Sequence, residues 1–189
     1  MSQSEISKAV GHLGNGELIG FPTDTVYGVA ADPYQEGAVA ALANLKGRDA
    51  SKPLAVLVAD MDQAISLVKF DDVALDLAEK HWPGGLTLVL RRIESVPDWI
   101  GDAHSRTVGV RSPDHPLALE LLEVFGPLVV TSANKAGAEP ALDADQAAEV
   151  LGGGVAQYLE GTSLGVMPST VVDLTRPAPL VLREGPVTI

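Results

Sequence analysis

The sequence predicts a single α/β domain over residues 1–189, with a twisted mixed sheet of about seven strands and flanking helices. Three observations lead to this fold class. Short apolar runs alternate with segments of helical periodicity. Hydrophobic residues make up 46% of the chain and aromatic residues only 4%, so Val, Leu, Ile and Ala must build most of the core. The 19 glycines and 13 prolines indicate many tight turns.

The first third of the chain predicts a helix, a strand and a second helix. Ile6, Val10 and Leu13 share one face of the first helix, which the glycines at 14 and 16 end. Glu17–Phe21 reads as a buried strand, closed by a proline. Gln35–Leu45 is rich in alanine and carries apolar residues at helical spacing, so it predicts a helix with one buried stripe.

The middle third predicts strands that are separated by two weaker helices. Leu54–Ala59 is a short continuous apolar run, which is typical of a strand covered on both faces. Met61–Val68 and Asp72–His81 have helical patterns with fewer apolar positions. Leu86–Leu90 then predicts another strand of the same sheet.

The last third completes the alternation. Thr107–Val110 and Leu128–Thr131 predict strands on either side of a helix over Pro116–Phe125. Asp143 is a good N-cap for a helix that stops at the glycines 152–154. The closing strands are expected at Tyr158–Glu160, Thr170–Leu174 and Leu180–Leu182.

Charge and composition exclude several classes of function. The formal net charge is -12, which argues against indiscriminate binding to nucleic acid. The basic residues lie near predicted loops and strand ends, so a local positive cavity is compatible with the acidic whole. The chain has no cysteine, which excludes disulfides, thiolate metal sites and cysteine nucleophiles. It shows no signal-like segment and no apolar run of membrane length, so we expect a cytoplasmic protein without membrane contact.

Two short motifs suggest enzymes but lack the required context. Gly161–Gly165 matches the G-x-S-x-G pattern of hydrolases, yet a β-branched run follows it and no histidine comes later in the chain. Ser132–Lys135 matches the S-x-x-K pattern of penicillin-binding enzymes, whose companion motifs are absent. The sequence has no P-loop motif. The four histidines show no metal-ligand spacing, so no protein-bound metal is expected.

Polar clusters follow or precede the predicted strands. Ligands of α/β proteins sit at strand ends, where loops converge on a crevice. Cations there suit a polyphosphate, and hydroxyl groups suit a small polar substrate. Each cluster alone fits ordinary turn chemistry, but together they predict one site. The clusters are Pro22–Gly28, Lys46–Arg48 with Lys52, Arg111–Pro113, Thr131–Asn134, Pro168–Thr170 and Arg183–Gly185.

At these residues the chain resembles the YrdC/TsaC family of threonylcarbamoyl-AMP synthases, in its short, single-domain form. The order and spacing of the motifs agree from about residue 14 to the end. Leu57 differs, because some relatives have a histidine there. The matching motifs are Pro22–Gly28, Lys46-x-Arg48 with Lys52-Pro-Leu54, Trp82-Pro-Gly84, Arg111-x-Pro-x-His-Pro116, Thr131–Asn134, Ser169–Asp173 and Leu182-Arg-x-Gly185.

The resemblance implies a fold, a reaction and a set of contacts. It implies a sheet around a concave basic cavity and the condensation of L-threonine, bicarbonate and ATP, with pyrophosphate released. Mg²⁺ is expected with the ATP. The resemblance places threonine on Thr25, Arg111, Ser132 and Ser169. It places ATP on Lys46, Arg48, Lys52, Thr107, Asn134 and Arg183, and catalysis on Lys46, Arg48, Ser132 and Asn134.

The resemblance also implies what happens to the product. Threonylcarbamoyl-AMP is handed transiently to a tRNA threonylcarbamoyl-transferase complex, with weak or no direct tRNA binding by this chain. Two alternatives remain open at this point. One is a non-catalytic RNA-binding module that uses the same basic concavity. The other is a carbamoyl-adenylate synthase of related fold that takes carbamoyl phosphate.

Overall fold

The computed structural model describes residues 3–47, 53–165 and 167–189. Within these ranges, nine strands form one mixed sheet in the order β7-β1-β2-β6-β3-β5-β4-β8-β9. The pairs β1–β7, β3–β5 and β4–β8 are parallel, and the other neighbours are antiparallel. The strands are β1 Ile19–Phe21, β2 Gly28–Ala31, β3 Ala55–Leu57, β4 Leu86–Arg91, β5 Thr107–Arg111, β6 Leu128–Ser132, β7 Gln157–Tyr158, β8 Thr170–Asp173 and β9 Leu180–Arg183.

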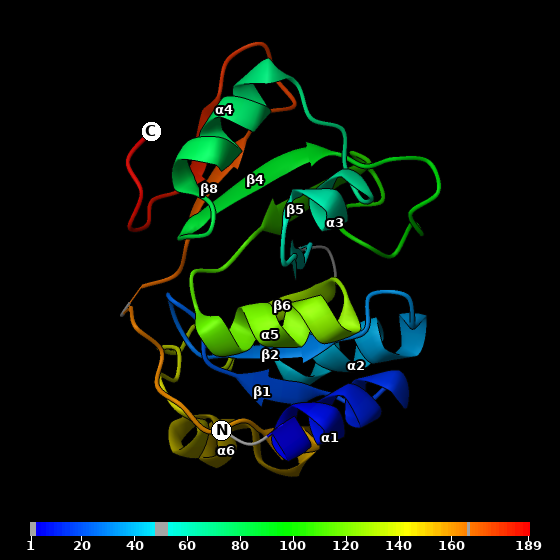
Figure 1. Cartoon of the computed structure of the whole chain (residues 1–189), viewed down its shortest axis with the longest axis vertical. Coiled ribbons are helices and arrows are strands. Elements are labelled where there is room, and N and C mark those ends of the chain that lie inside the picture. The colour runs from blue at the N-terminus through cyan, green and yellow to red at the C-terminus, as the bar shows by residue number, and fades with distance from the viewer. Residues whose placement is uncertain (1–2, 48–52, 166) are drawn as a thin grey trace.

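Six α-helices accompany the sheet in the described part of the chain (Figure 1). Asp60, Asp71 and Asp143 each cap a helix by accepting a hydrogen bond from a backbone N–H of its first turn. A 3₁₀ turn, Gly152–Gly154, follows the last helix. The helices are α1 Gln3–Gly14, α2 Glu36–Leu45, α3 Met61–Ile65, α4 Asp72–His81, α5 Pro116–Phe125 and α6 Ala144–Leu151.

Every strand range predicted from the sequence overlaps an observed strand, and β2 is the strand for which no range was predicted. This strand follows directly on the polar Pro22–Tyr27 segment and consists of Gly, Val and two alanines, a composition with little preference for strands. Pairing on both sides makes it a strand. Residues 28–30 align with β1, and the whole of β2 aligns with β6.

The two faces of the central strands differ in what covers them. Val56, Val108, Val110, Leu88 and Leu90 belong to an apolar cluster that packs against α3 and α4. The residues between them in each strand point to the opposite face, because successive side chains of a strand alternate. That opposite face carries the polar side chains described below.

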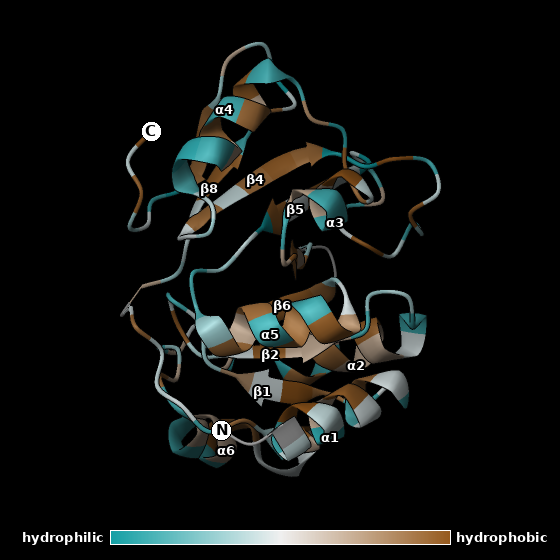
Figure 2. Ribbon diagram, in the orientation of Figure 1, coloured by the Kyte–Doolittle hydropathy of each residue, from teal (hydrophilic) through white to brown (hydrophobic). Residues whose placement is uncertain are grey.

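Helices also cover the other half of the sheet. Two further clusters pack there, one with α1 and α5 and the other with α2 and α6. Figure 1 shows these four helices around β1, β2 and β6, and α3 and α4 beside β4 and β5. In Figure 2 the strands are mainly brown, while hydrophilic residues gather on the helices and loops. The central part of one sheet face therefore stays free of helices.

Candidate active site

A cavity of about 590 Å³ lies on this face of the sheet. Alternate residues of the central strands line it, such as Thr87 and Val89 of β4, and Gly109 and Arg111 of β5. Glycine leaves room in its floor. A Cβ at Gly109 would lie 3.3 Å from Thr87 Cγ2, closer than most such contacts, so the neighbouring side chain would have to shift to admit it. The strand pattern thus produces a hollow and aims polar groups into it.

Arg111 lies at one end of the cavity and is anchored on three sides. Its Nε donates to Gly84 O at 2.9 Å, its Nη1 donates to Thr25 Oγ1 at 2.9 Å, and its Nη2 pairs with Asp24. Burial lowers the pKa of Arg111, and the attraction of Asp24 opposes that shift. A guanidinium stays charged at neutral pH. The three contacts therefore fix the orientation of the charged Arg111 side chain in the absence of a ligand.

The turn that carries Thr25 is held by Gly161–Gly165, the segment that matches the G-x-S-x-G pattern of hydrolases. Ser163 Oγ accepts a hydrogen bond from the Thr23 backbone N–H at 3.2 Å, and Leu164 N donates to Thr23 O at 3.1 Å. A Cβ at Gly165 would lie 2.8 Å from the carbonyl oxygens of Asp24 and Thr25. The G-x-S-x-G segment is thus a clamp on the 22–28 turn, and its serine hydroxyl oxygen accepts a hydrogen bond from the backbone of that turn.

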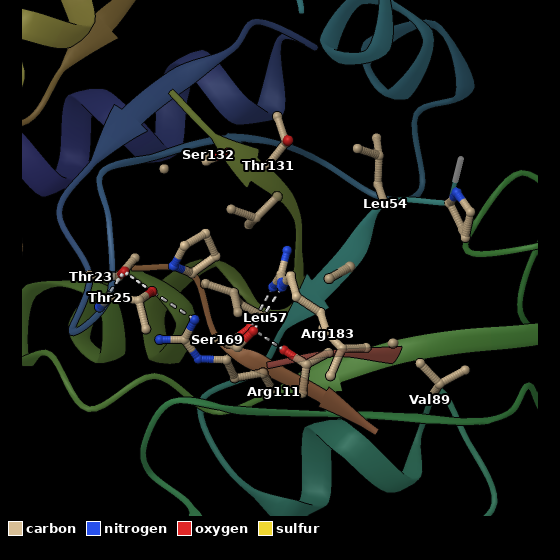
Figure 3. A pocket seen from close by; sticks show the side chains of 18 of the residues that line it. Thr23, Thr25, Leu54, Leu57, Val89, Arg111, Thr131, Ser132, Ser169 and Arg183 are labelled. Carbon is tan, nitrogen blue, oxygen red and sulfur yellow. Dashed lines mark hydrogen bonds between the residues drawn. The ribbon is translucent and has the colours of Figure 1, made fainter. Parts of the chain in front are cut away.

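A second arginine meets the same space from the edge of the sheet. Arg183 of β9 donates from Nε to Ser169 O at 2.9 Å and from Nη2 to Ser169 Oγ at 3.0 Å. Ser169 Oγ also lies 2.8 Å from Thr87 Oγ1. Figure 3 shows Arg111 and Arg183 with dashed lines to Thr25 and Ser169. Both charged side chains among the described lining residues are arginines, and Asp24 balances the charge of Arg111 from outside the lining.

Lys46 lies behind the cavity wall. Its Nζ donates to Ser132 O and Ser132 Oγ at 2.7 Å and to Asn134 Oδ1 at 2.5 Å, and the lysine is 8% exposed. Asn134 Nδ2 donates to the carbonyls of Lys135 and Ala138, which fixes the loop after β6. Ser132 is the member of this group that reaches the cavity, so it links the lysine charge to the site.

The structure brings most of the predicted site residues together. Those that line the cavity are Thr25, Thr107, Arg111, Ser132, Ser169 and Arg183. Lys46 and Asn134 contact Ser132 from behind and are not among the lining residues. Arg48 and Lys52 lie outside the described residues. Leu57 is part of the cavity wall next to Arg111, its partner in the β3–β5 register.

Sequence reasoning assigned no individual role in the site to three residues that shape it. Asp24 pairs with Arg111, Ser163 holds Thr23, and Thr87 contacts Ser169. A signal existed for Thr87, because it is the polar residue within the apolar strand run Leu86–Leu90. Asp24 and Ser163 act through long-range contacts, which a local pattern does not reveal. Asp24 is separated from Arg111 by 87 positions in the sequence, and Ser163 is separated from Thr23 by 140.

The arrangement suits an anionic ligand with apolar parts. Two fixed guanidiniums can bind carboxylate or phosphate oxygens. Leu57, Val89, Val130 and Val171 add apolar wall to the same cavity.

Within the described ranges, no group of three or more His, Asp or Glu side chains could hold a metal ion. No helix of this part of the chain is long and apolar enough to span a bilayer.

Comparison with solved structures shows where similar folds occur. The Pyrococcus abyssi Sua5 protein in complex with L-threonine superposes with a TM-score of 0.91 at 38% identity, covering 97% of this chain and 54% of that chain. Escherichia coli YciO gives a TM-score of 0.91 at 29% identity, with 98% and 91% covered. These structures confirm the predicted α/β class. The present chain spans about half the length of the Pyrococcus abyssi protein.

Sequence comparison gives the family. A Mycobacterium tuberculosis protein, provisionally named a threonylcarbamoyl-AMP synthase, is 46% identical over 185 residues, which are 97% of this chain and 85% of that protein. The Pyrococcus abyssi threonylcarbamoyl-AMP synthase is 40% identical over 185 residues, 96% of this chain and 54% of its own length. The model of the Sua5/YciO/YrdC family, described as "Telomere recombination", matches residues 12–185. The chain therefore belongs to the Sua5/YciO/YrdC family.

Proposed function

We propose that this protein is a threonylcarbamoyl-AMP synthase, a nucleotidyltransferase that condenses L-threonine, bicarbonate and ATP. The observation that carries the proposal is a cavity in which two arginines are held in place by hydroxyl and carbonyl groups. Its volume of about 590 Å³ suits a small-molecule site. Relatives are named for this activity, and the Sua5 structure from Pyrococcus abyssi contains L-threonine.

The two arginines divide the cavity between the substrates. We assign threonine and its carbamate to Thr25, Arg111, Ser132 and Ser169, because a fixed guanidinium among hydroxyls suits a carboxylate and a hydroxyl group. ATP is assigned to Thr107 and Arg183, with Lys46 and Asn134 acting from behind Ser132. Arg48 and Lys52, which lie outside the described residues, are proposed as further phosphate contacts from the sequence resemblance.

The reaction needs no covalent enzyme intermediate. The threonine amine attacks the carbon of bicarbonate, and loss of water leaves a carbamate. One carbamate oxygen then attacks the α-phosphorus of ATP. The bond between this phosphorus and the oxygen that bridges it to the β-phosphorus breaks, and pyrophosphate leaves. The protein contributes by positioning both reactants and by balancing phosphate charge with its cations. A serine nucleophile is therefore not required.

Mg²⁺ is proposed as the partner of the triphosphate. The described lining residues offer hydroxyls and guanidiniums rather than carboxylates. Mg²⁺ would therefore be held by phosphate oxygens and water, as is usual for nucleotide sites.

The product is a mixed anhydride, an activated acyl donor. We propose that a separate tRNA threonylcarbamoyl-transferase complex consumes it, with this chain making weak or no direct contact to tRNA.

The proposal is tested by pyrophosphate release with Mg-ATP, bicarbonate and one amino acid at a time. Threonine should be the best substrate. Serine lacks one methyl and should be disfavoured by about 1–3 kcal/mol, and valine should stay near background because the site hydroxyls would be left unpaired. Release should depend on bicarbonate, and carbamoyl phosphate should not replace threonine and bicarbonate. The absence of release with every amino acid would reject the proposal.

A further inference from the structure

Thr87 is a buried polar residue that contacts Ser169 and is not among the proposed substrate contacts. It lies on β4, is 4% exposed, and faces the cavity between two residues that face the apolar core. Its Oγ1 lies 2.8 Å from Ser169 Oγ, and Ser169 is the one side-chain hydrogen-bond partner of Thr87 among the described residues. The pair links β4 to the residue that precedes β8, its parallel neighbour in the sheet.

The protons of this pair can be assigned once the proposed substrate contact at Ser169 is included. A hydroxyl has one proton and two acceptor positions. Arg183 Nη2 donates to Ser169 Oγ at 3.0 Å and fills one of the acceptor positions. If Ser169 donated to Thr87, the Thr87 proton would point to no acceptor among the described residues, and a buried donor without a partner is costly. If Thr87 donates to Ser169, the proton without a protein acceptor is that of Ser169, and a substrate bound to Ser169 as proposed supplies the acceptor in the cavity.

The backbone of Ser169 is fixed independently of Thr87. Arg183 Nε donates to Ser169 O at 2.9 Å, and the next residue, Thr170, donates from its backbone N–H to Gly85 O at 2.9 Å. Gly185 packs so closely that a Cβ there would lie 2.5 Å from the Ser169 carbonyl carbon. Loss of the Thr87 hydroxyl should therefore change the direction of the Ser169 O–H without moving the chain.

We propose that Thr87 is a positioning residue, whose hydroxyl donates to Ser169 Oγ and commits the Ser169 proton to an anionic oxygen of the substrate. The inference rests on the proposed function, in which Ser169 binds threonine or its carbamate. With Arg183 and Thr87 occupying both acceptor positions, Ser169 can act toward a ligand only as a donor. A carboxylate or carbamate oxygen satisfies it, whereas a ligand ammonium or amide N–H does not.

The test uses two substitutions at residue 87. Thr87→Val keeps the shape and removes the hydroxyl, while Thr87→Ser keeps the hydroxyl and removes the methyl. Thr87→Val should weaken threonine binding, measured by calorimetry, about tenfold, and raise KM for threonine in proportion. KM for ATP should change less than about twofold, because the Arg183 contact with Ser169 O remains. Thr87→Ser should stay within about threefold of the wild type in both measurements.

A double-mutant cycle separates positioning from direct contact. If Thr87 acts through Ser169, adding Thr87→Val to Ser169→Ala should weaken threonine binding no further than Ser169→Ala does alone. An equal loss in both backgrounds, unchanged binding in Thr87→Val, or a Thr87→Ser variant as weak as Thr87→Val would each overturn the inference. A wild type that binds threonine but releases no pyrophosphate would instead reject the proposed function, and the binding measurements would still decide the role of Thr87.

Discussion

Replacing Arg111 by lysine tests whether the fixed guanidinium, rather than positive charge alone, binds threonine. Arg111 meets three acceptors from three different nitrogens: Gly84 O, Thr25 Oγ1 and the Asp24 carboxylate. A lysine ammonium is a single point with three hydrogens and cannot replace a planar fork. Each hydrogen bond to a charged group contributes about 1.5–3 kcal/mol, so the loss of even one fixed contact to the substrate should matter.

We expect Arg111→Lys to raise the Kd for threonine at least about tenfold, which corresponds to about 1.4 kcal/mol. Calorimetric titration of threonine measures this effect directly. The substitution should also lower the melting temperature, because the buried acceptors around residue 111 lose donors. A melting curve for each variant shows that the protein titrated is folded.

Arg92→Lys is the matched control. Arg92 is also a buried arginine, and it also anchors a loop, through the carbonyls of Pro97 and Ile100 and the carboxylate of Asp98. It does not line the cavity. Arg92→Lys should therefore lower the melting temperature and leave the threonine Kd within about twofold of the wild type. Wild-type threonine affinity in folded Arg111→Lys, or an equal loss of affinity in Arg92→Lys, would refute the assignment of Arg111.

Three further predictions use other parts of the molecule. Lys46→Ala and Arg48→Ala should each raise the Kd for ATP about tenfold or more, measured by calorimetry, and unchanged values in both would remove the phosphate assignment. Gly165→Ala should destabilise the protein by about 1–3 kcal/mol and weaken threonine binding, because the new methyl meets the carbonyls of Asp24 and Thr25 at 2.8 Å. Gly153→Ala, with nothing within 4 Å, is its control in the same melting and binding assays, and similar losses in both would contradict the clamp. No stable complex with free tRNA should form at physiological salt, since the net charge is -12, and a tight, salt-sensitive gel shift would favour the RNA-binding alternative.

Local patterns in the sequence determined most of the secondary structure. The predicted helix over Pro116–Phe125 agrees with α5 at both ends, and Asp143 caps α6 as expected. Short-range physics decides these features, because helical spacing, an N-cap or a proline acts within one or two turns. The strand β2 was missed for the same reason, since its small residues have no local strand signal and become a strand only by pairing with β1 and β6.

The sequence by itself also determined which side chains to consider for the site, and Thr25, Arg111, Ser169 and Arg183 all line one cavity. Only the tertiary structure decided how they act on one another. Three pairs of contacting residues are far apart in the sequence. The separation is 87 positions for Asp24 and Arg111, 82 for Thr87 and Ser169, and 140 for Ser163 and Thr23. Such contacts depend on the order and register of the strands, which no local pattern encodes. Lys46 shows the same limit, because its position behind Ser132 follows from the packing of α2 on β2, the neighbour of β6, rather than from its own neighbours in the chain.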